Sequence, residues 1–474
     1  MRWFARLAPS LVLTAGMTAC GGAPPRTEPH ASVALPDDWS AARAPAQISA
    51  AWSSSFTDPR LLAIVDEALA HNWDLAAASA RLDAAVAEAR IAGADVFPVV
   101  NARASATRQQ QVFTGLPIPS ADGPLTSRST NYGVSLDFQW ELDLWGRLRG
   151  TRSAAGADFA AAAADYEGAR LSLTAQTIKA WFAAAESRRQ LELAETTHES
   201  FTQTTRRIRA LYESGARPSL DLRLARSDEA SAEATVALRR DVHERTLRQL
   251  ELLLGRYPSA TFEPAGELIQ PPAEIPEGLP AQLLARRPDL VAAERRVAAA
   301  GARVGSSRAA LLPRITLTAS GGAVSDDLRQ LLDGDFRVWS LAAGLLQPLF
   351  QGGRLRANLA RSQSIEDQAV ASYAGAVLRA CGEVENALHA EQSLAVQEAS
   401  LTRATDEARA AFDLARSRYD TGVTDAATLL SARRAFTAAE SRLLEVRRQR
   451  LDARVDLHLA LGGGFTAGVP KAES

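Results

Sequence analysis

The side chains that most often carry out catalysis or bind metals are thinly spread in this 474-residue chain. Its six histidines include no pair four residues apart, the spacing that binds zinc on one face of a helix. A glutamate follows His198 and His243, but Thr202 and Leu247 stand where a metalloprotease motif needs its second histidine. The chain also lacks a Gly-x-Ser-x-Gly nucleophile elbow and a Gly-Lys-Ser/Thr phosphate loop. We therefore expect no catalytic site, no metal and no cofactor.

Cys20 is the one residue near the amino terminus with a chemical role to consider. The apolar stretch before it, residues 7–19, is shorter than the ~20 residues of a membrane-spanning helix, so residues 1–19 are predicted to be a signal peptide. The small residues that precede Cys20 resemble the lipobox of bacterial lipoproteins, in which the cysteine receives lipid. This resemblance implies a lipidated Cys20 and an extended tether over residues 20–51; the alternative is an ordinary signal peptide with a chance cysteine.

The overall composition is that of a folded chain without strong charge bias. Hydrophobic residues make up 46% and charged residues 23% of the sequence. The 53 basic and 55 acidic residues give a net charge of -2, which argues against a nucleic-acid partner. Two cysteines exclude a disulfide framework.

One internal repeat organises the chain. The motif around Asp74 recurs around Asp289, and the Gly-Arg-Leu-Arg motif that begins at Gly146 recurs at Gly353. The first offset is eight residues longer than the second, so a single gap explains both. The predicted units are a first repeat over 52–257, a linker over 258–277, a second repeat over 278–464, and a tail over 465–474.

Each repeat is predicted to contain a helix, two strands and two very long helices. Long proline-free stretches rich in Ala, Leu, Arg, Glu and Gln favour the helices. In the first repeat we expect strands at about 98–112 and 130–144 and long helices at about 147–213 and 218–254. In the second we expect strands at about 313–324 and 337–347 and long helices at about 353–420 and 425–461.

Residues 132–144 show the clearest strand pattern, because apolar and polar side chains alternate throughout. The polar face includes Asp137, Glu141 and Asp143. This pattern is typical of a membrane barrel with an aqueous lumen, which these acids would line, although a water-soluble antiparallel sheet alternates in the same way. The lipidation signal favours the barrel. Four strands cannot close one, so the chain must oligomerise.

Two segments near the start resemble the outer-membrane efflux channel family, in its lipoprotein branch. Segment 52–61 reads Trp-x-x-x-Phe-x-Asp-Pro-x-Leu, and segment 67–82 reads Glu-Ala-Leu-x-x-Asn-x-Asp-Leu-x-x-Ala-x-x-Arg-Leu. A Tyr-x-x-Gly signature at the end of the first long helix of each repeat, and Leu-Gly at the end of each repeat, strengthen the resemblance.

The resemblance implies a mostly helical protein that forms a trimer. Its 12-stranded barrel would lie in the outer membrane of a Gram-negative bacterium and continue as a helical tunnel across the periplasm. It implies an exit duct for small molecules that works with a periplasmic adaptor and an inner-membrane proton-driven (RND-type) pump, without chemistry of its own. The alternative is a lipid-anchored periplasmic coiled-coil scaffold or adaptor without a pore.

The resemblance also places a periplasmic gate near the two Tyr-x-x-Gly turns. The corresponding positions are Tyr212, Gly215, Asp221, Tyr419, Gly422, Asp425, Ser431 and Arg434. Ser431 departs from the family, which often has an aspartate there in an acidic ring. Charged neighbours such as Asp425 and Arg434 are candidates to replace it.

Overall fold

The computed structural model describes residues 39, 56, 58–113, 125–262, 268–269, 271 and 283–465. The elements of the first half are α1 (Pro59–His71), α2 (Trp73–Ala94), β1 (Val99–Phe113), β2 (Leu125–Leu142), α3 (Arg147–Glu213) and α4 (Ser219–Leu253). Those of the second half are α5 (Leu283–Arg286), α6 (Pro288–Ala309), β3 (Arg314–Ser325), η3 (Gly334–Phe336), β4 (Arg337–Leu346), α7 (Arg354–Asp420) and α8 (Ala426–Ala460). The prediction of a mostly helical chain with a small sheet is confirmed.

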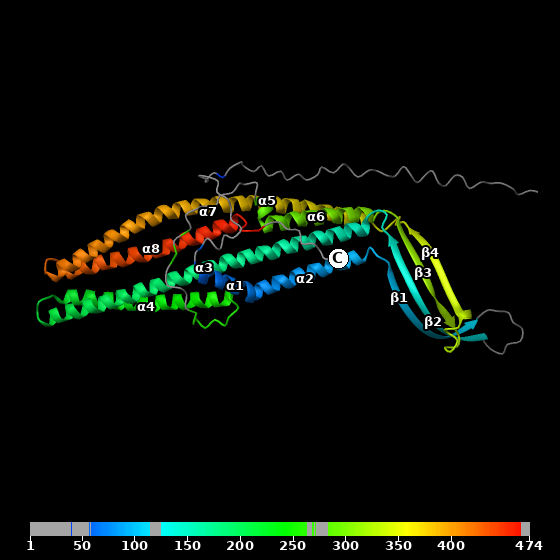
Figure 1. The fold of residues 1–474 in the computed structure, drawn as a ribbon, viewed down its shortest axis with the longest axis horizontal. Helices are drawn as coiled ribbons and strands as arrows, with labels where there is room; N and C mark the ends of the chain where they lie inside the picture. Colours follow the sequence, from blue (N-terminus) through cyan, green and yellow to red (C-terminus); the bar gives the residue numbers. More distant parts are fainter. Residues whose placement is uncertain are drawn as a thin grey trace, which may run out of the picture.

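The molecule is a long helical body with a sheet at one end and two helix turns at the other (Figure 1). The helices α3 and α7 each contain 67 residues, which corresponds to ~100 Å at 1.5 Å per residue. Each turns back into a 35-residue partner, α4 or α8. The shorter helices α2 and α6 lie beside the half of α3 that is nearer the sheet (Figure 1).

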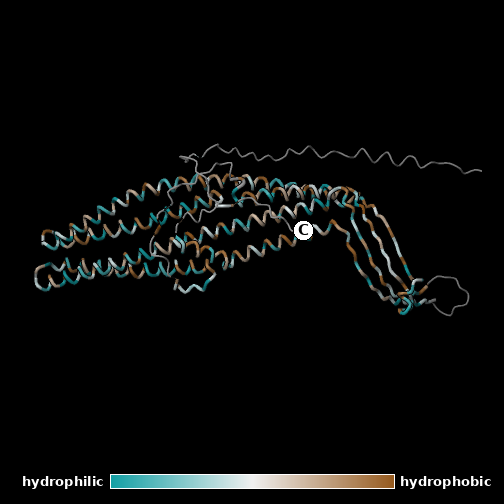
Figure 2. The backbone as a smooth tube through the Cα atoms, viewed as in Figure 1, coloured by the Kyte–Doolittle hydropathy of each residue, from teal (hydrophilic) through white to brown (hydrophobic). Residues whose placement is uncertain are grey.

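All four strands belong to one antiparallel sheet in the order β1-β2-β3-β4. The strands β1 and β4 therefore form its two edges. Apolar residues recur along the strands as well as in the helical body (Figure 2). None of the described helices is both long enough and apolar enough to cross a bilayer.

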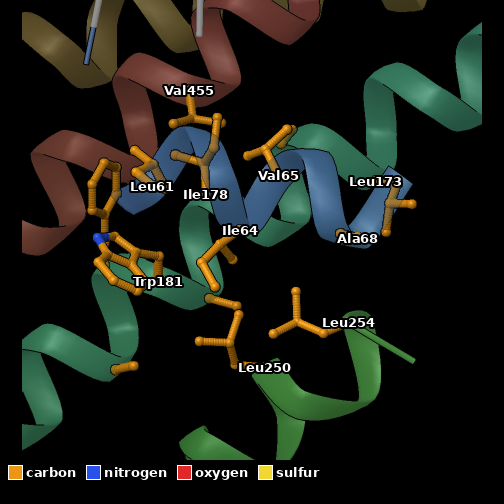
Figure 3. Close-up of a cluster of buried hydrophobic side chains, with 14 of the residues drawn as sticks. Leu61, Ile64, Val65, Ala68, Leu173, Ile178, Trp181, Leu250, Leu254 and Val455 are labelled. Carbon is orange, nitrogen blue, oxygen red and sulfur yellow. The ribbon is translucent and has the colours of Figure 1, made fainter. Parts of the chain in front are cut away.

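The largest hydrophobic core joins both halves of the chain. Leu61 and Ile64 of α1 pack against Ile178 and Trp181 of α3, and Val455 of α8 closes the cluster (Figure 3). Leu250 and Leu254 complete it from the end of α4. This core fixes the helical body about midway between the sheet and the helix turns (Figure 1).

The second strand differs from its predicted span of 130–144. It begins at Leu125, before the alternation becomes regular, and ends at Leu142. Asp143 lies outside the strand, in the turn that leads into α3, so its placement on the strand was wrong. The physical reason is that its carboxylate binds the start of α3.

Candidate functional site

The sheet has one polar face that continues across all four strands. Residues directly opposite each other in a sheet share a face, and the register aligns Asn101, Asp137, Ser320 and Ser340 in one row. Within this row, Ser320 Oγ donates a 2.7 Å hydrogen bond to Asp137 Oδ1. Ser135 Oγ donates to Asp137 Oδ2 at 3.2 Å. The Asp137 carboxylate is therefore held in place on the polar face.

The opposite face is apolar and open to its surroundings. The next row of the register aligns Val100, Phe138, Ala319 and Leu341. Leu341 is 74% exposed and Trp339, on the same face, is 83% exposed. An exposed apolar face backed by a polar one fits a sheet that separates lipid from water.

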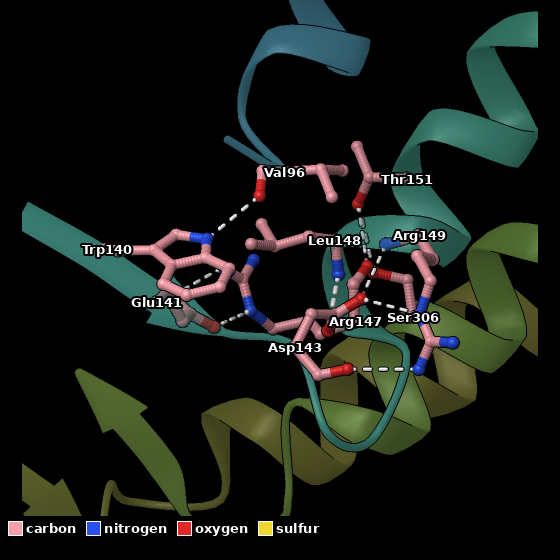
Figure 4. A network of polar contacts seen from close by, with 9 residues as sticks. All are labelled: Val96, Trp140, Glu141, Asp143, Arg147, Leu148, Arg149, Thr151 and Ser306. Atoms are coloured by element: carbon pink, nitrogen blue, oxygen red, sulfur yellow. Dashed lines mark hydrogen bonds and ion pairs between the residues drawn. The ribbon is translucent and has the colours of Figure 1, made fainter. Parts of the chain in front are cut away.

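A compact polar joint connects β2 to α3 (Figure 4). Arg147 donates two hydrogen bonds, from Nε and Nη2, to the carboxylate of Glu141 at 2.9 and 2.8 Å. The indole of Trp140 donates to the carbonyl of Val96 at 3.0 Å. Ser306 of α6 donates to the carbonyl of Arg147 at 2.9 Å. The joint thus fixes the strand against two helices.

Asp143 caps α3 within this joint. Its two carboxylate oxygens accept hydrogen bonds from the backbone N–H groups of Leu148 at 3.0 Å and Arg149 at 2.8 Å. The residue at the N-cap itself, Gly146, has no side chain for this purpose. Although burial opposes the charge, these hydrogen bonds and the cation of Arg149 lower the pKa of Asp143. The negative charge of Asp143 therefore stabilises the start of α3.

The two helix turns at the far end share one geometry. Gly215 and Gly422 adopt φ values of +78° and +77°, in the left-handed region that favours glycine. In the first turn, the N–H of Ala216 donates to the carbonyl of Leu211 at 2.9 Å. The N–H of Val423 makes the equivalent bond to Arg418. These are Schellman motifs, so each glycine reverses the chain between two long helices.

The predicted gate residues next to these turns have different surroundings. Asp221 is buried in the first turn of α4, with its carboxylate 4.0 Å from Arg217. Asp425 is exposed and caps α8 by accepting the N–H of Thr428 at 2.8 Å, and the hydrogen bonds from Thr428 lower its pKa. Ser431 is exposed on α8, and Tyr212 is 43% exposed near the end of α3.

Tyr419 is one of two predicted gate residues that join the two helix pairs. It is 5% exposed, and burial raises the pKa of its phenol. The guanidinium groups of Arg217 and Arg207 lie over its ring at 5.2 and 5.9 Å. Arg207 also forms an ion pair with Asp420. The structure therefore brings residues from the α3–α4 turn to the end of α7.

A second link lies nearer the body. Arg434 of α8 forms a 3.0 Å ion pair with Asp228 of α4. The sequence indicated Arg434 but missed Arg207, Arg217 and Asp228, because these contacts join residues about two hundred positions apart. Only the excess of charged residues near both turns pointed to them. Cys20 lies outside the described residues.

Comparisons with known proteins agree with this architecture. The chain matches the outer membrane efflux protein family over residues 64–256 and 279–463. It is 35% identical to outer membrane protein OprJ of Pseudomonas aeruginosa over 468 residues, which cover 97% of this chain and 96% of OprJ. It is 34% identical to the solvent efflux pump outer membrane protein SrpC of Pseudomonas putida over 415 residues, 87% of each chain.

Solved structures show the same fold. The outer-membrane channel OprN matches with a TM-score of 0.83 at 31% identity, over 91% of this chain and 97% of OprN. The CmeC outer membrane channel of Campylobacter jejuni matches with a TM-score of 0.85 at 25% identity, over 93% of this chain and 94% of CmeC.

Paired long helices that end in a sheet with one polar and one apolar face therefore define an outer-membrane channel. The chain belongs to the outer membrane efflux protein family. It lies in the outer membrane and serves as the exit duct of an efflux system. Its relatives are channel proteins rather than enzymes. The alternative of a scaffold without a pore is therefore set aside.

Proposed function

We propose that three copies of the chain close one 12-stranded barrel and continue as a helical tunnel through which small molecules leave the periplasm. The observation that carries this proposal is the four-stranded sheet with one polar and one exposed apolar face. Its edges, β1 and β4, would leave backbone groups unpaired in lipid, at a cost of several kcal/mol each. Pairing β1 of one copy with β4 of the next removes both edges.

The helical body also has two margins that suit a ring. The packing order of the long helices is α4, α3, α8, α7, so α4 and α7 lie at opposite margins. Both carry exposed apolar side chains, such as Leu238 on α4 and Val396 on α7, which are 58% and 68% exposed. If α4 of one copy contacts α7 of the next, the copies form a closed ring when the rotation between them adds up to a full turn.

In this assembly the polar row containing Asp137 faces the lumen. Glu141 is neutralised there by Arg147, and Asp143 is used to cap α3. Asp137 has no ion-pair partner in the part of the chain that the structure describes, so it is the main source of fixed negative charge among the three acids.

The gate is proposed to lie near the two turns, where Tyr419 and Arg207 hold the helix pairs together. Opening would separate the α7–α8 pair from the α3–α4 pair. The exposed tips, with Leu220 at 64% and Val423 at 73% exposure, would meet the periplasmic adaptor of an RND-type pump. Lipid on Cys20 would hold the protein in the outer membrane.

The closed barrel is tested by disulfide cross-linking between copies. In a Cys381→Ser background, Asn101→Cys on β1 is combined in turn with Val338→Cys, Ser340→Cys and Ala342→Cys on β4. The membranes are oxidised and the products are separated by size under denaturing conditions. We expect at least one pair to give linked dimers and trimers.

A matched control uses two neighbouring strands of one sheet. Gln139→Cys with Thr318→Cys joins positions that are opposite each other in β2 and β3, so the link should stay within one chain. If every edge pair gives only single chains while this control pair oxidises, the shared barrel is wrong.

A further inference from the structure

A pocket of about 450 Å³ lies between α3 and the α7–α8 pair, close to the helix turns. We call it the hairpin pocket. It is large enough for a drug-sized molecule, since ligand pockets commonly measure ~300–1,000 Å³. Its lining includes Phe201 and Arg207 of α3, Phe412 and Tyr419 of α7, and Leu430 and Arg433 of α8.

Arg433 is the unusual member of this lining. Its guanidinium lies over the rings of Phe412 and Phe436, at 4.8 and 5.9 Å. Its Nε atom is buried and has no hydrogen-bond partner among the described residues. Burial is the largest cause that lowers the pKa of Arg433, and the nearby cation Arg416 lowers it further. Glu440 and Asp413 attract the charge, but only from farther away. A partly desolvated cation without a close anion is unfavourable.

The rest of the lining combines apolar, positively charged and neutral polar side chains. Phe201, Phe412 and Leu430 are 5%, 8% and 2% exposed and provide a hydrophobic floor. Arg416 adds a second cation beside Arg433. Asp420 is already engaged by Arg207. Among the described residues that line the pocket, this leaves Glu199 as the one carboxylate without an ion pair, against Arg416 and Arg433.

A second polar group in this wall also lacks a partner. The hydroxyl of Tyr419 is buried without a hydrogen bond in the described part of the chain. Buried polar atoms normally have partners, and each exception calls for an explanation. A hydrogen-bond acceptor that enters the pocket would give a partner to the Tyr419 hydroxyl and to the Arg433 Nε–H group.

We propose that the hairpin pocket binds an amphipathic organic anion, with its apolar ring against Phe412 and Leu430 and its carboxylate beside Arg433. The ligand would contact α3 of the first helix pair and both helices of the second. It would therefore hold the two pairs in the arrangement that the structure shows. A cationic ligand is disfavoured because Arg416 and Arg433 repel it.

The proposal is tested with the full chain purified in detergent and naphthoate as the probe, by isothermal titration calorimetry. We expect saturable binding of naphthoate and binding weakened by about tenfold or more for neutral naphthamide, the loss expected for a charge-assisted hydrogen bond. Arg433→Gln should weaken naphthoate binding by a similar factor, and Arg433→Lys, which keeps the charge, should lose less.

The matched control is Arg442→Gln. Arg442 is an exposed arginine of the same helix and does not line the hairpin pocket. This variant should bind naphthoate as the unchanged protein does. Absence of naphthoate binding, equal binding of naphthamide, or equal losses in Arg433→Gln and Arg442→Gln would each overturn the proposal.

Discussion

The guanidinium carbon of Arg217 lies 5.2 Å from the centre of the Tyr419 ring, so the turn after α3 contacts the end of α7. Arg207 approaches the same ring from α3 and also pairs with Asp420. Contacts of this kind at partly exposed sites are each worth ~0.5–1 kcal/mol. Two helix pairs held by such modest contacts can separate without unfolding.

The first prediction concerns this link. Arg207→Gln removes both the ion pair with Asp420 and the contact with Tyr419. If these contacts hold the gate, their loss of about 1 kcal/mol should raise the leak current several-fold, roughly fivefold. The current is measured in planar bilayers. Arg206→Gln, at an exposed neighbouring position, serves as the control. Equal leak currents in the two variants would show that Arg207 does not hold the gate.

The second prediction concerns the strand-to-helix joint. Asp143→Ala removes the cap of α3 and should lower the free energy of unfolding by about 1 kcal/mol. The lowered pKa of Asp143 means that this contribution is present above the pKa of the unfolded chain, near 4, and is lost as the pH falls through the lower native value. Thermal unfolding of both proteins at neutral and acidic pH measures it. Asp95→Asn, at an exposed position, is the control. If Asp143→Ala remains less stable than the unchanged protein at low pH, the Asp143 carboxylate does not act as the cap.

The third prediction concerns Asp452, a partly buried acid between α3 and α8. Burial raises the pKa of Asp452 to about 6 despite the nearby cations Arg448 and Lys179, and the carboxylates of Asp456 and Glu186 add to the rise. The protonated acid therefore favours the folded state below the unfolded pKa near 4, and this contribution is lost as the pH rises through about 6.

Asp452→Asn mimics the protonated acid. It should stabilise the protein at pH above 7 by about 2–3 kcal/mol, the equivalent of two pKa units, and leave stability nearly unchanged near pH 4. Denaturant unfolding followed by circular dichroism at both pH values measures the difference. A variant with the same pH dependence as the unchanged protein would contradict this view of Asp452.

The fourth prediction concerns ion selectivity. Asp137→Asn should reduce the preference for cations, because a carboxylate on the polar face of the sheet attracts them. The double variant Glu141→Gln with Arg147→Gln should have a smaller effect, because it removes an ion pair that carries no net charge. Reversal potentials across a salt gradient measure the preference. A larger change in the double variant than in Asp137→Asn would reverse this assignment.

The long helices could be predicted because proline and glycine mark their ends. Between Gly146 and Gly215 no proline interrupts α3, and Pro218 precedes the start of α4. The alternation over 132–144 likewise indicated a sheet with two different faces. Such local patterns determine which elements form and which side of each is apolar.

Other features depend on contacts that a local pattern does not contain. The early start of β2 at Leu125 is set by pairing with Phe113 of β1, although residues 125–131 are mostly polar. The turn at Asp143 depends on a hydrogen bond to a helix that begins four residues later. The links of Arg207 and Arg434 join the two halves of the chain, so only the packing of both halves could reveal them.

The shared aqueous pore is tested most directly by thiol accessibility in reconstituted channels. In a Cys381→Ser background, Ser320→Cys places a thiol on the polar face, and Ala319→Cys places one on the apolar face of the same strand. We predict that a charged methanethiosulfonate added to the water reduces the single-channel current of Ser320→Cys and leaves that of Ala319→Cys unchanged. Block of Ala319→Cys alone, or of neither variant, would contradict a lumen lined by the polar face.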